Sequence, residues 1–523
     1  MRDPITITND DELAAVANSG TGTANDPYII ADWNITDSTT HGISITGTTK
    51  HFRVENCWIE SSVEYGSCGI YVNNVSAGTT TIINNTCNNN IYGIFLWDSG
   101  SSTVTNNTCN NNDGCGIAVS SSGSSTVTNN TCNSNTGSGI FLDRSGFSIV
   151  ANNTFFNDGL QVRLYSKEEL FSYTVENNTV NGLPLGYFAN VTDSTISKTY
   201  GQLILVNCNN TIVKNQYYSN TYIGIALYFC DENQLVNNTC NNNIYGIYLG
   251  GSGSSTVTNN TCNNNDGCGI AVSSSGSSMV TNNTCTNNDR NGICLDHSGS
   301  STVTNNTCNS NYGSGICLDH SGSLTVTNNT CNSNTGAGIS LFGCDSITVI
   351  NNICSNNNRN SIGLGGSDSS TVANNICNNN SYYGIEIFYA RNNSIVGNTL
   401  VGNGVYGIEL SDDSANNVIH HNDFIANGQN TSQACDNGMN NQWYDETVLE
   451  GNYWSDYSGN GSYLIAGSAG ASDPYPSLSP YRYTSSSSSP AFPQDVLVRI
   501  GLFLVVIGFL VVVLFVNKRK ISS

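Results

Sequence analysis

The sequence has few charged residues and few of the residues that favour helices. Only 10% of its 523 residues are charged, whereas glycine alone occupies 52 positions, and Asn, Ser and Thr dominate much of the rest. Straight-chain residues such as Glu, Lys, Arg and Leu form helices most readily, so their scarcity argues against long helices. We therefore expect an all-β ectodomain.

Basic residues are especially scarce. Lys and Arg total 16 against 38 Asp and Glu, which gives a net charge of -22 and an isoelectric point near 4.3. Binding to nucleic acid requires clustered Lys and Arg, so this composition excludes nucleic acid as a partner. A weakly charged, acidic surface rich in Asn and Thr instead fits an extracellular or sugar-facing protein.

Long apolar runs are absent except near the C-terminus. Every residue from Ile500 to Val516 is apolar or glycine, and the run extends back to Val496 with one interruption at Arg499. That length matches the roughly 20 residues that cross a bilayer. The basic residues at 518–520 mark the cytoplasmic side. The sequence predicts one membrane-spanning α-helix at 496–516, a cytoplasmic tail at 517–523 and an ectodomain outside the cell.

An export signal is also absent from the first residues. The segment that begins at Met1 contains no apolar signal sequence, so we expect a signal upstream of this sequence or a misassigned start. Residues 484–495 are rich in Ser and Pro, which is typical of a linker. This linker would connect the ectodomain to the membrane.

The sequence does contain a repeat of 23 residues. A Gly-Ile-x-(Leu/Val/Ile) motif recurs at this interval and is followed in most copies by a segment like STVTNNTC. Short alternating apolar runs between Gly, Ser and Asn turns indicate strands. The motif begins at Gly69, Gly93, Gly116 and Gly139, and again at Gly246, Gly269, Gly292, Gly315, Gly338, Ser361, Gly384 and Gly407.

A unit of this length cannot bury its own apolar side, so neighbouring units must stack as a solenoid. Three short strands per unit, with a strand spacing of about 4.8 Å, predict a parallel β-helix of about seventeen coils and about 80 Å. We assign an N-terminal cap to residues 1–40, the β-helix to 41–430 with irregular coils at about 155–222, and a C-terminal cap to 431–483.

Alternation predicts which side chains face the interior. In NGICL, Ile293 and Leu295 point inward and Cys294 outward, and in the next segment Val303 and Cys308 point inward. Asn residues before each inward Cys are expected to bond from coil to coil. In-register parallel strands suit disulfide geometry poorly, so we interpret the inward cysteines as small buried hydrophobic residues rather than disulfides or metal ligands. They are Cys87, Cys109, Cys132, Cys240, Cys262, Cys285, Cys308, Cys331, Cys354 and Cys377.

Three segments outside the repeat carry a family resemblance. They are GTGTANDPYIIADWNIT (20–36), the irregular middle containing GQLILVNCNNTIVKN (201–215), and GNYWSDYSGNGSYLIAGSAGASDPYP (451–476). Together they resemble NosD-like, right-handed parallel β-helix proteins of archaeal type, within the pectate-lyase-like solenoid superfamily. The resemblance covers nearly all of the chain outside the linker and anchor. It implies a right-handed coil, an exported location and an archaeal source.

The resemblance also implies two kinds of function. The name-giving NosD proteins are periplasmic and are tied to copper-site maturation of nitrous oxide reductase. Many relatives are surface proteins grouped with carbohydrate-binding and sugar-hydrolysing β-helices. Pectate-lyase-like and polygalacturonase-like enzymes, which this architecture resembles, use the outward face of the GIxL strand, so candidate sites are sought there.

The heptapeptide CLDHSGS occurs twice, one coil apart, at 294–300 and 317–323. Asp296 and Asp319 would lie about 5 Å apart, close enough to act as the nucleophile and general acid of a retaining glycosidase. An Asp at the start of a Ser-Gly turn is also an ordinary cap of backbone amides. The neighbouring thiols and imidazoles would suit copper or zinc. The candidate metal ligands are Cys294, His297, Cys317 and His320.

Outward aromatic residues provide a third candidate site. Such rings can stack on an extended sugar. The candidates for glycan stacking are Phe95, Trp97, Phe141 and Tyr248.

We interpret the protein as a membrane-anchored, cell-surface β-helix with a binding or structural role, whose partner is a glycan or another surface protein. Two alternatives stay open. One is a polysaccharide lyase or hydrolase that uses the outward acidic residues Asp296 and Asp319. The other is a copper- or zinc-binding NosD-like protein; no further cofactor is evident from the sequence.

Overall fold

The computed structural model describes residues 2–38, 40–61, 67–163, 165–428 and 432–482. This part of the chain is built almost entirely from short strands, wound into about 17 turns of about 23 residues each. The structure therefore confirms the predicted parallel β-helix. No helix within the described ranges is long and apolar enough to span a membrane. The predicted linker, membrane-spanning helix and tail lie outside those ranges.

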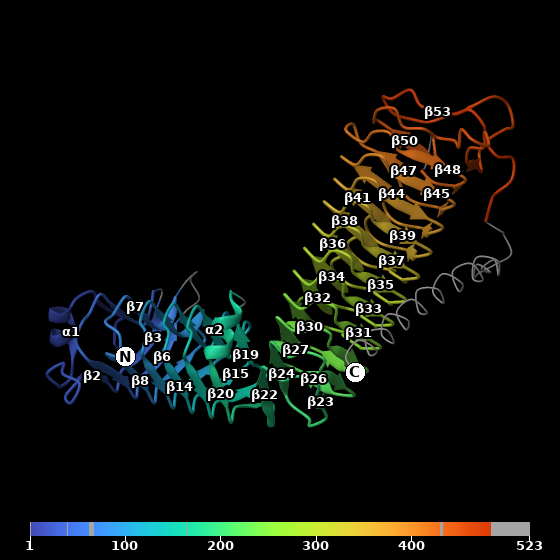
Figure 1. The fold of residues 1–523 in the computed structure, drawn as a ribbon. Coiled ribbons are helices and arrows are strands. Elements are labelled where there is room, and N and C mark those ends of the chain that lie inside the picture. Colours follow the sequence, from blue (N-terminus) through green and yellow to red (C-terminus); the bar gives the residue numbers. More distant parts are fainter. Residues whose placement is uncertain (1, 39, 62–66, 164, 429–431, 483–523) are drawn as a thin grey trace, which may run out of the picture.

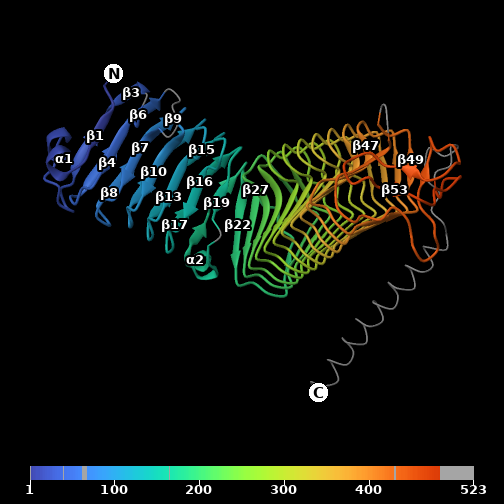
Figure 2. The same cartoon turned by 90° about the horizontal axis from the view of Figure 1, so that it is seen from above.

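The solenoid consists of two arms that meet at a bend (Figure 1). We call residues 2–182 the N-terminal arm and residues 183–482 the C-terminal arm. Figure 2 shows the same two stacks of coils from above, with the bend near β22 (Leu183–Ala189). The predicted single rod is therefore divided in two, and the division falls within the segment that the sequence marks as irregular.

Each arm has three parallel sheets because each coil contributes one strand to each of three faces. We number them N1 to N3 in the N-terminal arm. Sheet N1 contains β1 (Ile5–Ile7), β4 (Ile43–Thr46), β7 (Cys68–Asn73), β10 (Tyr92–Trp97), β13 (Ile117–Ser120), β16 (Ile140–Asp143) and β19 (Leu160–Val162). Sheet N2 contains β2 (Tyr28–Ala31), β5 (Phe52–Glu55), β8 (Thr80–Ile83), β11 (Thr103–Thr105), β14 (Thr126–Thr128), β17 (Ile149–Ala151) and β20 (Thr174–Glu176). Sheet N3 contains β3 (Asn34–Ser38), β6 (Trp58–Ser61), β9 (Thr86–Asn88), β12 (Thr108–Asn110), β15 (Thr131–Asn133), β18 (Thr154–Phe156) and β21 (Thr179–Val180).

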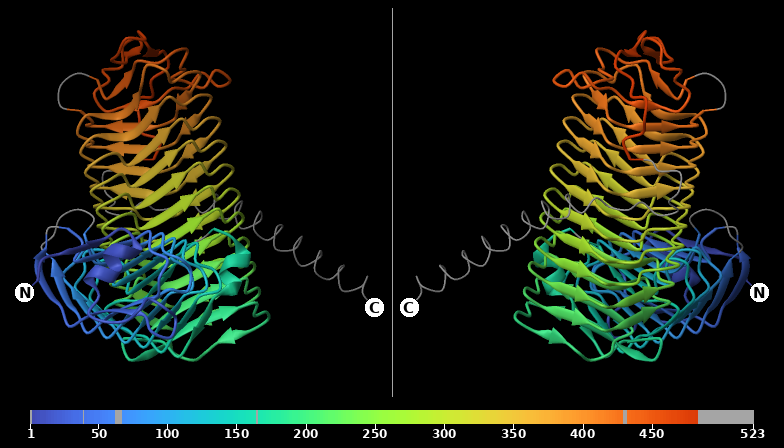
Figure 3. Two further views of the ribbon diagram at one scale, coloured as in Figure 1. Left: turned by 90° about the vertical axis from the view of Figure 1, so that its left-hand side faces the viewer. Right: turned by 90° about the vertical axis from the view of Figure 1, so that its right-hand side faces the viewer.

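The C-terminal arm repeats this plan in sheets C1 to C3 (Figure 3). Sheet C1 contains β22, β24 (Gln202–Val206), β27 (Ile223–Tyr228), β30 (Tyr245–Gly250), β32 (Ile270–Ser273), β34 (Ile293–Asp296), β36 (Ile316–Asp319), β38 (Ile339–Phe342), β41 (Ile362–Gly365), β44 (Tyr383–Phe388), β47 (Tyr406–Leu410) and β50 (Ala434–Asp436). Sheet C2 contains β23 (Thr195–Ile196), β25 (Ile212–Lys214), β28 (Gln234–Val236), β31 (Thr256–Thr258), β33 (Met279–Thr281), β35 (Thr302–Thr304), β37 (Thr325–Thr327), β39 (Thr348–Ile350), β42 (Thr371–Ala373), β45 (Ser394–Val396) and β48 (Val418–His420). Sheet C3 contains β26 (Tyr217–Ser219), β29 (Thr239–Asn241), β40 (Ile353–Ser355), β43 (Ile376–Asn378), β46 (Thr399–Val401), β49 (Asp423–Ile425) and β51 (Tyr453–Trp454), and isolated bridges fill the gap between β29 and β40.

Equivalent residues of successive coils are in register, which places identical side chains above one another. Ile293 pairs with Ile316 and Leu295 with Leu318, and all four side chains are fully buried. The ten cysteines of the predicted inward column are also fully buried and form no disulfides. Burial raises the pKa of thiols such as Cys132 and Cys285 well above the ordinary value. They pack as small apolar side chains in the interior.

Buried asparagines close the corners between sheets. The side-chain amide of Asn306 donates to the Val280 carbonyl at 2.9 Å and to the Asn329 Oδ1 at 3.0 Å, and its backbone N–H donates to the same Oδ1 at 2.9 Å. The preceding residue, Asn305, has a φ of 55°, which asparagine tolerates better than most residues. The expected coil-to-coil asparagine ladder is therefore present.

The two arms join through strands that are buried on both faces. In β24, Leu203 and Leu205 face the core of the C-terminal arm, whereas Ile204 and Val206 belong to the core of the N-terminal arm. The Gln202 side chain accepts from the Leu160 N–H at 2.9 Å and donates to the Leu160 carbonyl at 2.8 Å. The Gln202 amide thus pairs with the backbone N–H and carbonyl of Leu160 at the edge of β19. The last coil of the first arm therefore ends against the outer face of sheet C1.

Both outer ends of the solenoid are covered. At the N-terminal end, helix α1 (Asp10–Val16) is capped by Asn9 and buries Leu13. A second helix, α2 (Lys167–Ser172), lies at the junction of the two arms and buries Leu170. At the C-terminal end, Trp454 stacks between Phe424 at 4.1 Å and Tyr463 at 4.0 Å, beside the hairpin of β52 (Tyr463–Leu464) and β53 (Ser472–Asp473). These rings close the apolar interior.

Candidate functional site

The paired CLDHSGS motifs lie side by side on the outward face of sheet C1. Cys294 is in register with Cys317, and Asp296 is in register with Asp319, as the 23-residue period predicts. A chain of thiol hydrogen bonds runs from Cys268 through Cys294 to Cys317, and the bond from Cys294 lowers the pKa of the Cys317 thiol. Cys268 did not stand out in the sequence because its motif reads CGIAV.

The two histidines of these motifs contact each other and their own aspartates. His297 and His320 stack with ring centroids 5.2 Å apart. His297 Nδ1 lies 2.6 Å from Asp296 Oδ1, and His320 Nδ1 lies 2.7 Å from Asp319 Oδ1. The first pair forms a hydrogen bond, whereas Asp319 Oδ1 has no hydrogen-bond partner among the described residues despite its nearby imidazole. Thiols pair with thiols and imidazoles with imidazoles, and the four predicted metal ligands do not converge on one point.

The predicted stacking aromatics fall in two separate places. Phe95 and Trp97 lie on sheet N1 with ring centroids 5.9 Å apart, and Trp97 is 46% exposed. Phe141 lies on the same sheet, two coils further along. Tyr248 instead packs against Tyr228 at the junction between the arms, at a centroid distance of 5.7 Å. These residues therefore do not form one platform.

A groove of about 840 Å³ lies on the outward face of sheet C1, directly beyond the second CLDHSGS motif. Its floor is formed by small residues of β38 and β41, including Ser340, Gly363 and Gly365. Charged and aromatic side chains stand around this floor; they are Asp289, Arg290, Tyr312, Phe342, Arg359, Glu386 and Phe388. Both acids and both arginines line the groove, so its formal charges balance.

Two carboxylates in neighbouring coils continue from this groove. Glu386 lines it and is in register with Glu409 of the next coil. Burial raises the pKa of Glu386, while the amide of Asn360, which donates to its Oε2 at 2.6 Å, and Arg359 lower it. Burial first, and then repulsion from Glu386, raises the pKa of Glu409 to about 7. Glu409 therefore keeps its proton up to about pH 7, whereas an exposed glutamate loses it near pH 4.5.

The sequence contained these groove residues but did not single them out. Arg290 and Arg359 lie 69 residues apart, which is three coils of 23, and only the coil register brings them onto one face. Glu386 and Glu409 were recognisable as outward residues. Their raised pKa values depend on burial, which the repeat pattern does not specify.

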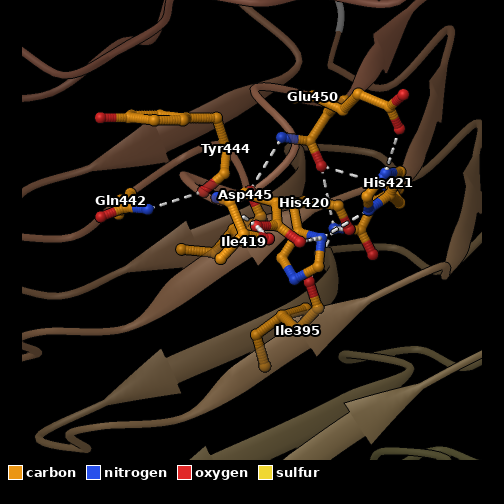
Figure 4. Close-up of polar contacts among 12 residues, drawn as sticks. Ile395, Ile419, His420, His421, Gln442, Tyr444, Asp445 and Glu450 are labelled. Carbon is orange, nitrogen blue, oxygen red and sulfur yellow. Dashed lines mark hydrogen bonds and ion pairs between the residues drawn. The ribbon is translucent and has the colours of Figure 1, made fainter.

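A second cluster lies at the C-terminal cap and contains the residues of the described ranges that could hold a metal ion. One ring nitrogen of His420, one of His421 and a carboxylate oxygen of Asp445 all lie within 4.8 Å of one another (Figure 4). Sequence reasoning missed this group because Asp445 belongs to the loop between β50 and β51. The available signal was the His-His dipeptide, which stands where other coils have Thr-Asn or Val-Gly.

Three parallel sheets wound from in-register coils define the class of the protein. The family described as "Right handed beta helix region" matches residues 15–180 and 185–330, and the chain belongs to this family. A second description, "Periplasmic copper-binding protein (NosD)", matches residues 309–459. The chain is thus a NosD-like parallel β-helix repeat protein. No curated protein matches the sequence.

Several solved structures are similar to this chain at low identity. The periplasmic alginate epimerase AlgG is 13% identical, with 79% of this chain and 82% of that chain covered and a TM-score of 0.35. The Dettilon tailspike protein is 12% identical, with 79% and 68% covered and a TM-score of 0.35. The A-module of the Azotobacter vinelandii mannuronan C-5 epimerase AlgE4 is 12% identical, with 86% and 100% covered and a TM-score of 0.26. Similarity at this level carries no information on activity.

The NosD description raises the question of which residues here would suit copper. Soft Cu(I) favours thiolates, but within the described part of the chain the Cys268, Cys294 and Cys317 thiols run in a line and do not converge as a group of three ligand atoms. Two imidazoles and a carboxylate suit a divalent ion such as Cu(II) or Zn(II). The His420 cluster therefore fits such an ion, and the site built from Cys294, His297, Cys317 and His320 stays a prediction.

Proposed function

We propose that this protein is a membrane-anchored, cell-surface β-helix that binds an extended glycan in the groove of sheet C1. The observation that carries the proposal is the groove itself, which combines a flat floor of small residues with exposed rings and mixed polar side chains. Tyr312 is 72% exposed, Phe342 56% and Phe388 44%. Exposed rings beside paired polar groups are typical of surfaces that stack on sugars and bind their hydroxyl groups.

The charges of the groove favour a neutral glycan over a polyanion. Arg290 and Arg359 are balanced by Asp289 and Glu386, and the whole chain carries a net charge of -22. A polyanion would gain little from the two guanidinium groups and would be repelled by the rest of the surface. Neutral hydroxyl groups can accept from the arginines and donate to the carboxylates.

Binding is tested by calorimetric titration of the full-length chain, in mild detergent, with six-unit oligosaccharides of glucose, mannose, N-acetylglucosamine and galacturonate. We expect a neutral oligosaccharide to bind and the galacturonate to bind at least tenfold more weakly. Phe342→Ala should weaken binding about tenfold, because it removes a stacking ring. Phe147→Ala is the matched control, since Phe147 is 75% exposed but lies on the N-terminal arm. Equal effects of the two substitutions would contradict the proposal.

A catalytic role is a second candidate, and the protonated Glu409 beside Glu386 favours it. Carboxyl groups about 5 to 5.5 Å apart serve retaining glycosidases, and neighbouring coils are separated by about 4.8 Å. Glu409 would act as general acid and Glu386 as nucleophile; Asp296 and Asp319 are the earlier candidates for the same roles. Release of reducing ends from a bound glycan, abolished by Glu409→Gln and retained in Asp319→Asn, would support this assignment.

Anchoring in a membrane is part of the proposal and rests on the apolar run at 496–516. The full-length chain should sediment with membranes after an alkaline carbonate wash. A variant with two arginines placed in this run should be released by the same wash. Retention of both proteins, or release of both, would count against a single membrane-spanning helix.

A further inference from the structure

The His-His dipeptide lies where the last regular coil meets the loop between β50 and β51. His420 ends β48 and is in register with Val396, so His421 stands one residue on, opposite Gly397. His421 has a φ of 54°, a left-handed conformation that Gly397 and, in earlier coils, asparagines adopt in this row. The turn directs both imidazoles toward the loop. Their side chains are 17% and 23% exposed, so the pair is sheltered but open to solvent on one side.

The ligand atoms of three residues face one another across this turn (Figure 4). His420 Nδ1 lies 2.5 Å from His421 Nδ1 and 4.0 Å from Asp445 Oδ2. Asp445 is held in the loop by its backbone N–H, which donates to the Glu450 carbonyl at 2.7 Å, while the His421 N–H donates to the Gly451 carbonyl at 2.8 Å. The loop is therefore attached to the coil on both sides of the three converging atoms.

The second side-chain polar atoms of His421 and Asp445 already have partners. His421 Nε2 lies 2.7 Å from Glu450 Oε2; a carboxylate only accepts, so Nε2 donates and Nδ1 keeps its lone pair. Asp445 Oδ1 accepts from the backbone N–H and hydroxyl of Thr447 at 2.8 and 2.6 Å, which leaves Oδ2 directed at His420. A carboxylate that accepts from the remote nitrogen of a histidine is the usual outer support of a metal-bound imidazole.

We propose that His420 Nδ1, His421 Nδ1 and Asp445 Oδ2 bind one divalent transition-metal ion of the class of Zn(II) and Cu(II). Two imidazoles and a carboxylate with an open fourth position form the donor set that these ions take in proteins. In the metal-free chain the proton between the two Nδ1 atoms belongs to His420. When the ion binds, this proton moves to His420 Nε2, so both imidazoles bind as neutral ligands. The ion would hold the loop between β50 and β51 against the last coil.

The test is equilibrium dialysis of the full-length chain, in mild detergent at pH 7.5, against Zn(II) and in a second arm against Cu(II). We expect His421→Gln to bind one equivalent less of each ion than the unsubstituted chain. Asp445→Asn and Glu450→Gln should bind the ion at least tenfold more weakly, because one removes a ligand and the other the outer support of His421. The matched control is His51→Gln, which removes a histidine of the N-terminal arm and should leave the stoichiometry unchanged.

A second readout keeps the test independent of folding defects in the histidine variant. Leu449 is 52% exposed in the loop, so chymotrypsin should cleave there. Zn(II) should slow this cleavage at least fivefold in the unsubstituted chain and not in Glu450→Gln, whose folding is checked by circular dichroism. Equal metal stoichiometry in the unsubstituted chain and His421→Gln would overturn the proposal. Loss of the equivalent in Cys294→Ser/Cys317→Ser instead would also overturn it, because the ion would then belong to the thiols.

Discussion

Buried asparagine side chains fix how one coil meets the next. An apolar interior alone would tolerate sliding between coils, because Ile, Val and Cys have no directional contacts. Asn306, in contrast, bonds to one main-chain carbonyl and to the next asparagine, and it also accepts from Asn283 at 2.9 Å. Each amide is satisfied only when the coils are in register, so these residues specify register as well as stability.

Replacement of Asn306 by Ala should lower the free energy of unfolding by about 2 to 4 kcal/mol, because the Asn283 N–H groups and the Val280 carbonyl lose a buried partner. Asn305→Gly is the matched control one residue earlier. It should change stability by only about 0.5 kcal/mol, since glycine readily adopts the left-handed φ of 55° found there. Urea denaturation followed by circular dichroism measures both, and equal losses would refute the role of the ladder.

Glu409 gives a prediction for the pH dependence of stability. Burial and the nearby Glu386 raise its pKa to about 7, so the folded chain retains a proton that the unfolded chain loses near pH 4.5. The contribution of Glu409 to stability therefore falls as pH rises from about 4.5 to about 7. As pH rises between these values, the free energy of unfolding of Glu409→Gln should increase by about 1 to 2 kcal/mol relative to that of the unsubstituted chain. This figure allows for the partial exposure of Glu409. Urea titrations at pH 4.5 and 8 test this, with the exposed Glu446→Gln as a control that should show no such gain.

At the scale of the strands, the sequence predicted the regular coils but not the junction. The 23-residue period and the alternation of apolar residues were sufficient for the inward rows, such as Ile293 and Leu295, and for the pairing of the two CLDHSGS motifs. In β24, QLILV has no alternation, because both of its faces are buried. Such a run shows burial without showing what covers it, so the contact with the first arm required the structure.

The same distinction explains which site residues could be predicted from the sequence. Positions one coil apart were predictable, since register follows from the period. The His420 cluster depends on a loop outside the repeat, and the arginines of the groove depend on which turns protrude over sheet C1. Neither property is encoded in the spacing of the repeat.

Ala226→Glu should separate the arms or destabilise their contact. Ala226 is 1% exposed and lies in β27 against the core of the N-terminal arm, so a carboxylate there would be buried without a partner. We expect a loss of about 3 kcal/mol or more and a larger radius of gyration by small-angle X-ray scattering. Ser340→Glu is the control, because Ser340 occupies the same row five coils later but faces the groove. An unchanged radius and stability in Ala226→Glu would contradict the junction described here.

For the stability of the whole molecule, the division into two hydrophobic cores matters more than the length of the solenoid. One core contains Ile94 and the other Ile316, and they meet only through the strands at the bend. Stability in solenoids is mainly a sum over neighbouring repeats, so a substitution in one arm is transmitted weakly to the other.

In calorimetry, Ile94→Ala and Ile316→Ala should therefore each lower the midpoint temperature of a different unfolding transition. Both side chains are fully buried at equivalent positions of the repeat, so each should cost about 2 to 5 kcal/mol within its own arm. Because the two substitutions remove the same side-chain atoms, each variant serves as a control for the cavity that the other creates. A single transition lowered equally by both variants would show that the arms unfold as one unit.

The near-identity of successive coils also has a genetic consequence. A recombination event between the DNA copies of two neighbouring units would add or remove 23 residues and leave every asparagine and cysteine opposite an equivalent partner. Each event would change the length of an arm by about 4.8 Å without a new fold having to be found. The number of coils in this protein is thus a heritable property that determines the length of each arm. Unequal crossing-over between repeats would change the distance between the groove and the bend.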